Sequence, residues 1–133
     1  MIMKKRILVD LSATILHHGH IRLLKKASKF GEVWVALTSD KEIKKIKGYK
    51  PELNFNQRKE ILESIKFVNK VIKSKWLIDE KFLKKNKIFK LVHGNDNSNS
   101  IDKQRLIIFN RTKGISSTTI RKRSRKILRK INK

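Results

Sequence analysis

Residues 6–31 read RILVDLSATILHHGHIRLLKKASKFG, and this segment predicts a strand, a polar loop and a helix in that order. The aliphatic run at residues 6–9 is typical of a buried strand. Across residues 21–30 the apolar side chains recur at spacings of three and four, which predicts an amphipathic helix with one inward face: Leu23, Leu24, Ala27 and Phe30. Gly31 is expected to end this helix. A buried strand that leads into such a helix is typical of the crossover units of a parallel sheet.

The same alternation continues along the chain. Buried strands are predicted at residues 33–37, 71–72, 88–92 and 106–109, and helix-start signals occur at Ser39, Asn54, Asp79 and Ser116. The helix after Asn54 is expected to turn its apolar side chains inward: Ile61, Leu62, Ile65 and Val68. The last helix, at about residues 117–131, is basic and is expected to turn its apolar side chains inward: Ile120, Ile127, Leu128 and Ile131. The pattern predicts a single α/β domain over residues 1–133, with a parallel sheet of about five strands and helices on both faces.

The amino-acid composition limits which classes of protein this chain can belong to. The 133 residues suit one domain, and the absence of cysteine excludes a disulfide scaffold, a thiolate zinc site and a cysteine nucleophile. A formal net charge of +24 favours polyanionic partners such as nucleotides, phosphorylated metabolites, nucleic acid or an anionic membrane surface. A lysine-rich composition can equally place these charges on solvated helix faces without any binding role. Because no apolar stretch approaches about 18 residues, we expect no membrane span and a cytoplasmic protein.

A histidine motif, His17-His18-Gly19-His20, follows the first predicted strand and opens the first predicted helix. His17 and His20 are three positions apart, so both imidazoles can point at one anionic group, and Gly19 lets the backbone approach closely. A helix N-terminus adds unpaired N–H groups. This combination suits the α-phosphate of a nucleoside triphosphate, whose charge rises as pyrophosphate leaves. The same spacing also fits a metal-binding pair or ordinary loop residues.

A second motif, RTKGISSTTIR, occupies residues 111–121. Ser116 and Ser117 would open the last helix, and Arg111 and Lys113 flank it. The motif predicts a second phosphate site at a helix N-terminus. A glycine turn followed by a serine cap would give the same pattern without any ligand.

Together the two motifs resemble those of the cytidylyltransferase family of nucleotidyltransferases, nearest to the bacterial members that act on glycerol 3-phosphate. The resemblance runs from about Lys5 to Arg121. It implies a Rossmann-like fold and transfer of a cytidylyl group from CTP to a small phosphorylated alcohol, with release of pyrophosphate. It also implies Mg²⁺ carried with the triphosphate, and a homodimer.

The resemblance further implies which residues form the site. The catalytic set would be His17, His20, Lys47 and Arg111. The nucleotide-binding set would comprise Leu11, Ser12, His17, His20, Asn95, Asp96, Arg111, Ser116, Ser117 and Thr118. No protein residue is expected to hold a metal. The first loop departs from the family pattern, because residues 11–14 read Leu-Ser-Ala-Thr where the family has Gly-Thr-Phe-Asp.

Three alternatives remain open at this point. Residues 115–121 also resemble the corresponding string of adenylyltransferases, which use ATP on a phosphorylated cofactor precursor. The basic tail would suit a non-catalytic nucleic-acid-binding relative, or contact with anionic lipid. A catalytically inactive relative is the third alternative, because of the altered loop at residues 11–14.

Overall fold

A computed structural model describes residues 4–94 and 98–132 and confirms the predicted α/β class. Its single sheet contains five parallel strands in the order β3-β2-β1-β4-β5. The strands are β1 (Arg6–Leu11), β2 (Glu32–Thr38), β3 (Lys70–Ser74), β4 (Lys90–Gly94) and β5 (Leu106–Phe109). All five lie where the apolar runs predicted them.

The centre of the sheet is β1, with Val9 paired to Val35 of β2 on one side and to Val92 of β4 on the other. The chain builds the sheet outward from β1 to β3, then returns to the other side of β1 to add β4 and β5. In such sheets ligands bind beyond the carboxyl ends of the strands at the point of reversal. The loop after β1 and the segment after β4 therefore mark the expected site.

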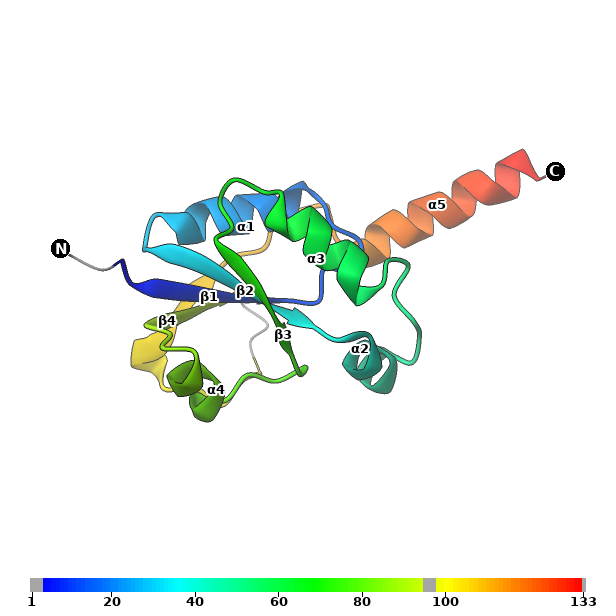
Figure 1. Ribbon diagram of the computed structural model, residues 1–133. Coiled ribbons are helices and arrows are strands. Elements are labelled where there is room, and N and C mark those ends of the chain that lie inside the picture. The colour runs from blue at the N-terminus through cyan, green and yellow to red at the C-terminus, as the bar shows by residue number, and fades with distance from the viewer. Residues whose placement is uncertain (1–3, 95–97, 133) are drawn as a thin grey trace.

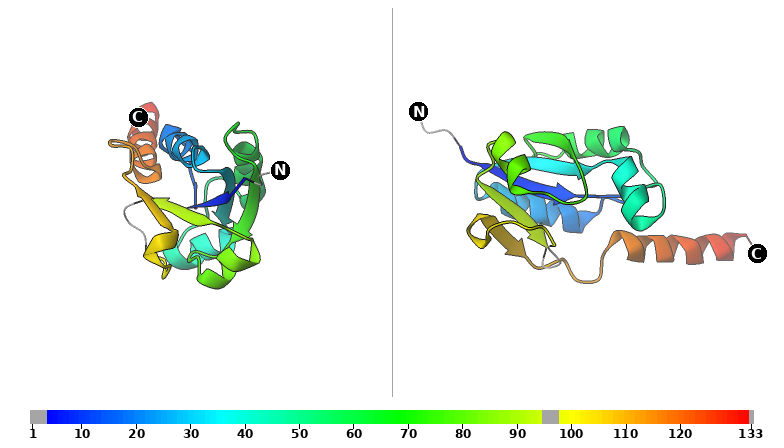
Figure 2. Two further views of the ribbon diagram at one scale, coloured as in Figure 1. Left: turned by 90° about the vertical axis from the view of Figure 1, so that its left-hand side faces the viewer. Right: turned by 90° about the horizontal axis from the view of Figure 1, so that it is seen from below.

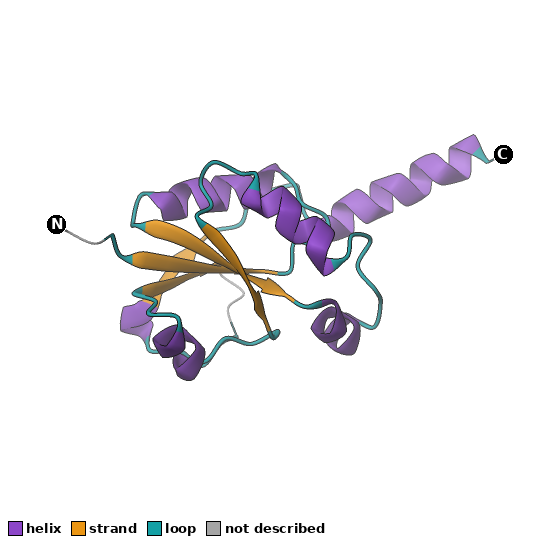
Figure 3. Ribbon diagram, in the orientation of Figure 1, coloured by secondary structure: helices purple, strands orange, loops and turns teal. Residues whose placement is uncertain are grey.

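Helices cover both faces of the sheet (Figures 1 and 3). On one face, α1 (His18–Ser28) and α3 (Phe55–Glu63) bury Leu24 and Leu62 in a core with Ile7 and Val9. On the other face, α4 (Glu80–Lys85) buries Leu83 in a second core with strand residues such as Leu8 and Leu91. The remaining helices are α2 (Asp40–Lys47), a 3₁₀ turn η1 (Lys103–Arg105) and α5 (Ser117–Ile131).

The predicted helix caps are confirmed by side-chain hydrogen bonds. Ser39, Asn54, Asp79 and Ser116 each accept a backbone N–H in the first turn of their helix. In the helices before α5, two residues predicted to face inward do not: Phe30 is 50% exposed and Ile61 39% exposed. The reason for Phe30 is that α1 ends at Ser28, so this ring lies past the helix and contacts Phe109 of β5 at the sheet edge.

The orientation of α5 differs from the prediction. Beyond its first turn the helix projects away from the rest of the domain (Figures 1 and 2), and none of its residues is buried. Ile127, Leu128 and Ile131 are 56%, 57% and 70% exposed, so the prediction that they face inward is wrong. The sequence pattern correctly indicated an apolar stripe on this helix. However, the helix extends beyond the edge of the domain, so the stripe does not pack against the sheet.

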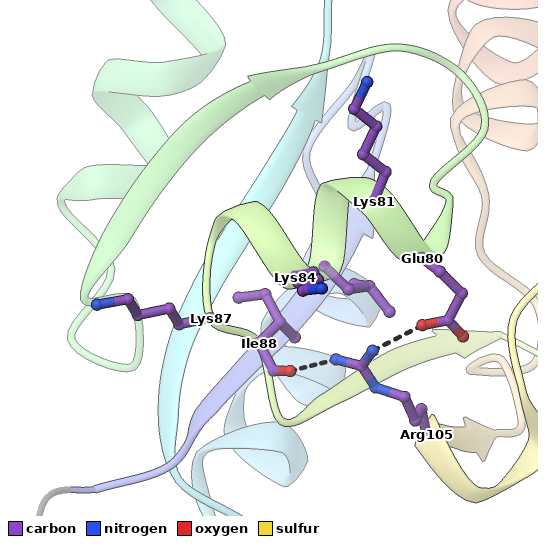
Figure 4. Close-up of a pocket in the computed structure, with 7 residues that line it drawn as sticks. Glu80, Lys81, Lys84, Lys87, Ile88 and Arg105 are labelled. Atoms are coloured by element: carbon purple, nitrogen blue, oxygen red, sulfur yellow. Dashed lines mark hydrogen bonds and ion pairs between the residues drawn. The ribbon is translucent and has the colours of Figure 1, made fainter.

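A hollow of about 480 Å³ lies against α4, lined by Glu80, Lys81, Leu83, Lys84, Lys87, Ile88 and Arg105 (Figure 4). Arg105 crosses it, donating to the Glu80 carboxylate at 2.6 Å and to the Ile88 carbonyl. Ile88 precedes β4 and Arg105 precedes β5, so the hollow lies at the amino ends of these strands. This end is opposite to the one where ligands bind in such sheets, and the arginine serves to tie α4 to the sheet.

Candidate active site

The two histidines of the first motif, His17 and His20, cap the N-terminus of α1 through hydrogen bonds from the backbone to their side chains. The Nδ1 atom of His17 accepts the N–H of Gly19 at 3.0 Å, and the Nδ1 atom of His20 accepts the N–H of His17 at 3.1 Å. The two rings lie 4.0 Å apart between centroids. This is a capping box built from imidazoles, which fixes both rings at the carboxyl end of the central strand.

These hydrogen bonds also determine which ring nitrogen carries the proton. Because each Nδ1 accepts a backbone N–H, the proton of each neutral ring must lie on Nε2. Burial, together with His17 and Arg111, lowers the pKa of His20 to about 4. The pKa of His17 is lowered by burial first and then by His18 and Arg111. At neutral pH the site therefore holds two uncharged imidazoles, each with an Nε2–H that can donate to an anion.

Ser117 joins the second motif to the loop that leads into the first motif. Its hydroxyl donates to the Ile15 carbonyl at 3.1 Å and accepts the Ile15 N–H at 3.3 Å. Ser116 caps α5, and the Thr119 hydroxyl accepts the Ser116 N–H in return. Segments more than 100 residues apart in sequence are thus held side by side, and Arg111 interacts electrostatically with both site histidines.

Arg121 fastens the first turn of α5 to two further loops. Its guanidinium makes a two-pronged contact with the Glu52 carboxylate and lies over the Tyr49 ring at 4.8 Å. The same guanidinium donates to the Thr14 hydroxyl at 2.7 Å. Hydrogen bonding by Arg121 lowers the pKa of Glu52. Thr14, which stands where the family pattern has aspartate, thus helps to fasten α5 to the loop after β1.

Arg58 is a site-building residue whose structural role the sequence did not reveal. It is only 2% exposed, although it belongs to a polar run at the start of α3. One guanidinium nitrogen donates to the carbonyls of Ser12 and Thr38 at 2.6 and 3.0 Å, and the other to the Asp40 carboxylate at 2.6 Å. A fourth hydrogen bond runs from Nε to the Leu53 carbonyl. Arg58 therefore holds the loops after β1 and β2 in fixed positions.

Asp10 is a second residue that sequence reasoning missed. Its side chain is 9% exposed, and its Oδ2 atom lies 3.3 Å from Nε2 of His93 on the adjacent strand β4. Asn99 also donates to Oδ2, whereas Oδ1 is buried and has no hydrogen-bond partner in the described part of the chain. The available signal was an acidic residue inside an otherwise aliphatic strand. The carboxylate lies on the central strand, at the point where the strand order reverses.

The remaining predicted residues fall into three groups. Leu11 and Ser12 lie at the end of β1, where their carbonyls accept hydrogen bonds from Thr38 and Arg58. Lys47 and Thr118 are exposed, and the Lys47 ammonium lies 5.5 Å from the centroid of the Trp76 ring. Asn95 and Asp96 lie outside the described residues.

Within residues 4–94 and 98–132 the structure brings together no three His, Cys, Asp or Glu side chains that could hold a metal ion. Over the same residues it contains no helix long and apolar enough to cross a membrane.

The geometry predicts that Gly19→Ala disables the site without unfolding the domain. A Cβ at this position would lie 2.8 Å from Cε1 and 2.9 Å from Nδ1 of His17. The His17 ring must then leave its capping position, and we expect nucleotide turnover to fall about tenfold or more. Steady-state kinetics together with thermal unfolding test this, with the exposed Lys25→Ala in the same helix as the control. Turnover equal to that of the unmodified protein would show that the His17 position is not needed.

The lowered pKa of His20 predicts a pH-dependent stability. An unfolded histidine takes up a proton near pH 6.5, whereas folded His20 does so only at about pH 4. Between these values the unfolded chain binds the extra proton, so stability falls as the pH is lowered through this window. Across the whole window, the titration of His20 should lower the free energy of unfolding by about 3 kcal/mol. Urea unfolding at pH 7.5 and pH 4.5 should show that the unmodified protein loses more stability than His20→Asn, and equal losses would contradict the prediction.

Comparison with known proteins places these features in a family. The cytidylyltransferase-like family model matches residues 13–123. The glycerol-3-phosphate cytidylyltransferase of Staphylococcus aureus is 35% identical over 122 residues, covering 88% of this chain and 92% of that protein. The Bacillus subtilis protein of the same name is 31% identical, covering 88% and 95%.

Two further similarities extend the comparison. An FAD synthase of Thermococcus sibiricus is 39% identical over 59 residues, covering 44% of this chain and 40% of the synthase. A lipopolysaccharide core biosynthesis protein from Thermoplasma volcanium has the same fold, with a TM-score of 0.70 and 21% identity, over 82% of this chain and 98% of that one. The second similarity supports the fold alone.

Proposed function

Because the chain belongs to the cytidylyltransferase-like family of nucleotidyltransferases, we propose that it transfers the cytidylyl group of CTP to a small phosphorylated alcohol of the glycerol 3-phosphate type. Pyrophosphate is the second product.

One observation carries the proposal: two neutral imidazoles at the N-terminus of α1, each with its proton directed to Nε2 by a backbone hydrogen bond. Donors of this kind need no rearrangement when negative charge builds up on a phosphate.

In the proposed reaction an oxygen of the acceptor's phosphate attacks the α-phosphorus of CTP. The bond between that phosphorus and the bridging oxygen breaks, and the electron pair leaves with pyrophosphate. His17 and His20 stabilise the charge on the α-phosphate and the bridging oxygen. Arg111, with the N-terminus of α5 at Ser116, holds the leaving pyrophosphate, and Lys47 contacts the phosphates from α2. The acceptor phosphate is already anionic, so the step needs no protein nucleophile.

Magnesium belongs to this proposal as part of the substrate. Mg²⁺ prefers phosphate oxygens and water to a dedicated protein cage, so it enters bound to the triphosphate and offsets its charge. A homodimer is also part of the proposal, on the strength of the family resemblance alone.

A second candidate is adenylyl transfer from ATP, which the similarity to the FAD synthase favours. The exocyclic amino groups of cytosine and adenine can both donate a hydrogen bond. The buried Oδ1 atom of Asp10, which has no partner among the described residues, therefore does not distinguish the two bases.

A substrate panel separates the two candidates. Pyrophosphate release is measured with CTP or ATP, in the presence of Mg²⁺, against glycerol 3-phosphate, other phosphorylated polyols, phosphocholine, phosphoethanolamine and flavin mononucleotide. The proposal predicts turnover with CTP and a phosphorylated polyol. Turnover only with ATP and the flavin would establish the second candidate in its place.

A further inference from the structure

Helix α5 ends in a basic, solvent-exposed segment that the proposed reaction does not use. Arg121 is held by Glu52 and Thr14, but the six basic residues that follow it are all exposed: Lys122, Arg123, Arg125, Lys126, Arg129 and Lys130. The helix contains no acidic residue. Two views show it extending away from the rest of the domain (Figures 1 and 2). A surface of this charge attracts an anionic partner.

The charged and apolar residues of α5 lie on separate faces. Successive residues of an α-helix are about 100° apart, which places Ile120, Ile127, Leu128 and Ile131 within one arc of roughly 100°. Ser124 lies in the same arc, and every basic residue of the helix lies outside it. Three of the four apolar side chains are more than half exposed. The helix thus has an uncovered apolar stripe that is flanked by cations on both sides.

We propose that α5 binds an anionic lipid surface, lying along it with the stripe among the acyl chains and the cations at the headgroups. Both faces of the helix find a partner in this arrangement, and the charge complementarity is with anionic headgroups. The stripe distinguishes this partner from RNA, which would engage the cations and leave the isoleucines and leucine exposed. Lipid binding of this kind does not depend on which substrate the protein uses.

A second copy of the chain is a less suitable partner for the apolar stripe than an anionic lipid surface. Two α5 helices packed together would bring their cations close with no acidic residue to balance them, and the rest of the chain is itself net positive.

The test measures co-sedimentation of the full chain with vesicles of phosphatidylcholine alone or with one third phosphatidylglycerol. A charge variant, Lys122→Gln/Lys126→Gln/Lys130→Gln, removes three cations from α5. A matched control, Lys81→Gln/Lys84→Gln/Lys87→Gln, removes three cations from the exposed surface beside α4. A stripe variant, Ile127→Ser/Leu128→Ser/Ile131→Ser, keeps every charge. All three changes lie on exposed surface, and circular dichroism checks that each variant is folded.

We expect binding to the anionic vesicles only. Each basic residue at such a surface contributes about fivefold, so the charge variant should bind on the order of a hundredfold more weakly and the control only a few fold more weakly. The stripe variant should lose at least tenfold in affinity. Equal losses in the charge variant and the control would overturn the proposal. Undiminished binding by the stripe variant would also overturn it, in favour of a general polyanion contact such as RNA. If the stripe variant instead changed from dimer to monomer without losing vesicle binding, the stripe would be assigned to a second copy of the chain.

Discussion

Replacing His20 by alanine is expected to lower kcat for nucleotidyl transfer by about a hundred- to a thousandfold. The substitution removes a neutral Nε2–H donor whose position is fixed before the substrate arrives, and the loss of one such donor has an effect of this size. It also removes the acceptor of the His17 N–H, so the position of the second imidazole becomes less well defined. Rapid-quench measurement of pyrophosphate release gives the rate of the chemical step.

His18→Ala is the matched control for this prediction. His18 lies in the same turn, but its side chain is exposed and takes no part in the capping box. We expect a change of less than about threefold from the control, and thermal unfolding shows whether both variants are folded. An equal loss of kcat in the two variants would mean that the motif acts through the stability of α1 rather than through the His20 donor.

Replacing Arg58 by methionine is expected to lower the free energy of unfolding by about 4 kcal/mol, and turnover with it. Methionine fills much of the same volume but leaves the Ser12, Thr38 and Leu53 carbonyls without their donor. The Asp40 carboxylate also loses its cation. Because the Asp40 side chain is 42% exposed, most of the loss comes from the three carbonyls, each of which costs about 1–3 kcal/mol when it is left without a donor. Urea unfolding of the two proteins measures the difference.

Two comparisons distinguish this role from a general effect of removing charge. Arg22→Met makes the same substitution at an exposed position of α1 and should change stability by less than about 0.5 kcal/mol. Arg58→Lys keeps the charge but lacks the planar guanidinium that reaches all four acceptors. Its stability should therefore lie between those of Arg58→Met and Arg22→Met. A loss of less than about 1 kcal/mol in Arg58→Met would show that the loops after β1 and β2 hold their positions without it.

Much of the fold could be predicted from the sequence because the strands of a covered parallel sheet are continuous apolar runs. The run at residues 6–9 and the Asn54 cap needed no tertiary information. The path of α5 could not be predicted without tertiary information. An apolar stripe shows that a helix has an apolar side, but it does not show which surface, if any, covers that side. Phe30 illustrates the same point, since its spacing continues the helical pattern beyond Ser28, where the helix itself ends.

The candidate site divides in the same way. His17 and His20 were found because their chemistry and their place after a strand coincide in a short motif. The role of Arg58 was not found, because a polar run at the start of a helix predicts a solvated side chain. Only the folded chain brings four hydrogen-bond acceptors around its guanidinium. The role of Asp10 depends on Asn99 and on His93 of the neighbouring strand, which are distant in sequence.

The fate of the phosphorus atoms of CTP tests the central proposal most directly. The protein is incubated with glycerol 3-phosphate, Mg²⁺ and CTP labelled at either the α- or the γ-phosphorus, and the products are separated by chromatography. Cytidylyl transfer at the histidine site predicts that the α-label appears in a new cytidine-containing diester, that the γ-label appears in pyrophosphate, and that His20→Ala nearly abolishes both. Release of the γ-label as inorganic phosphate, with the α-label retained in CDP, would contradict the account.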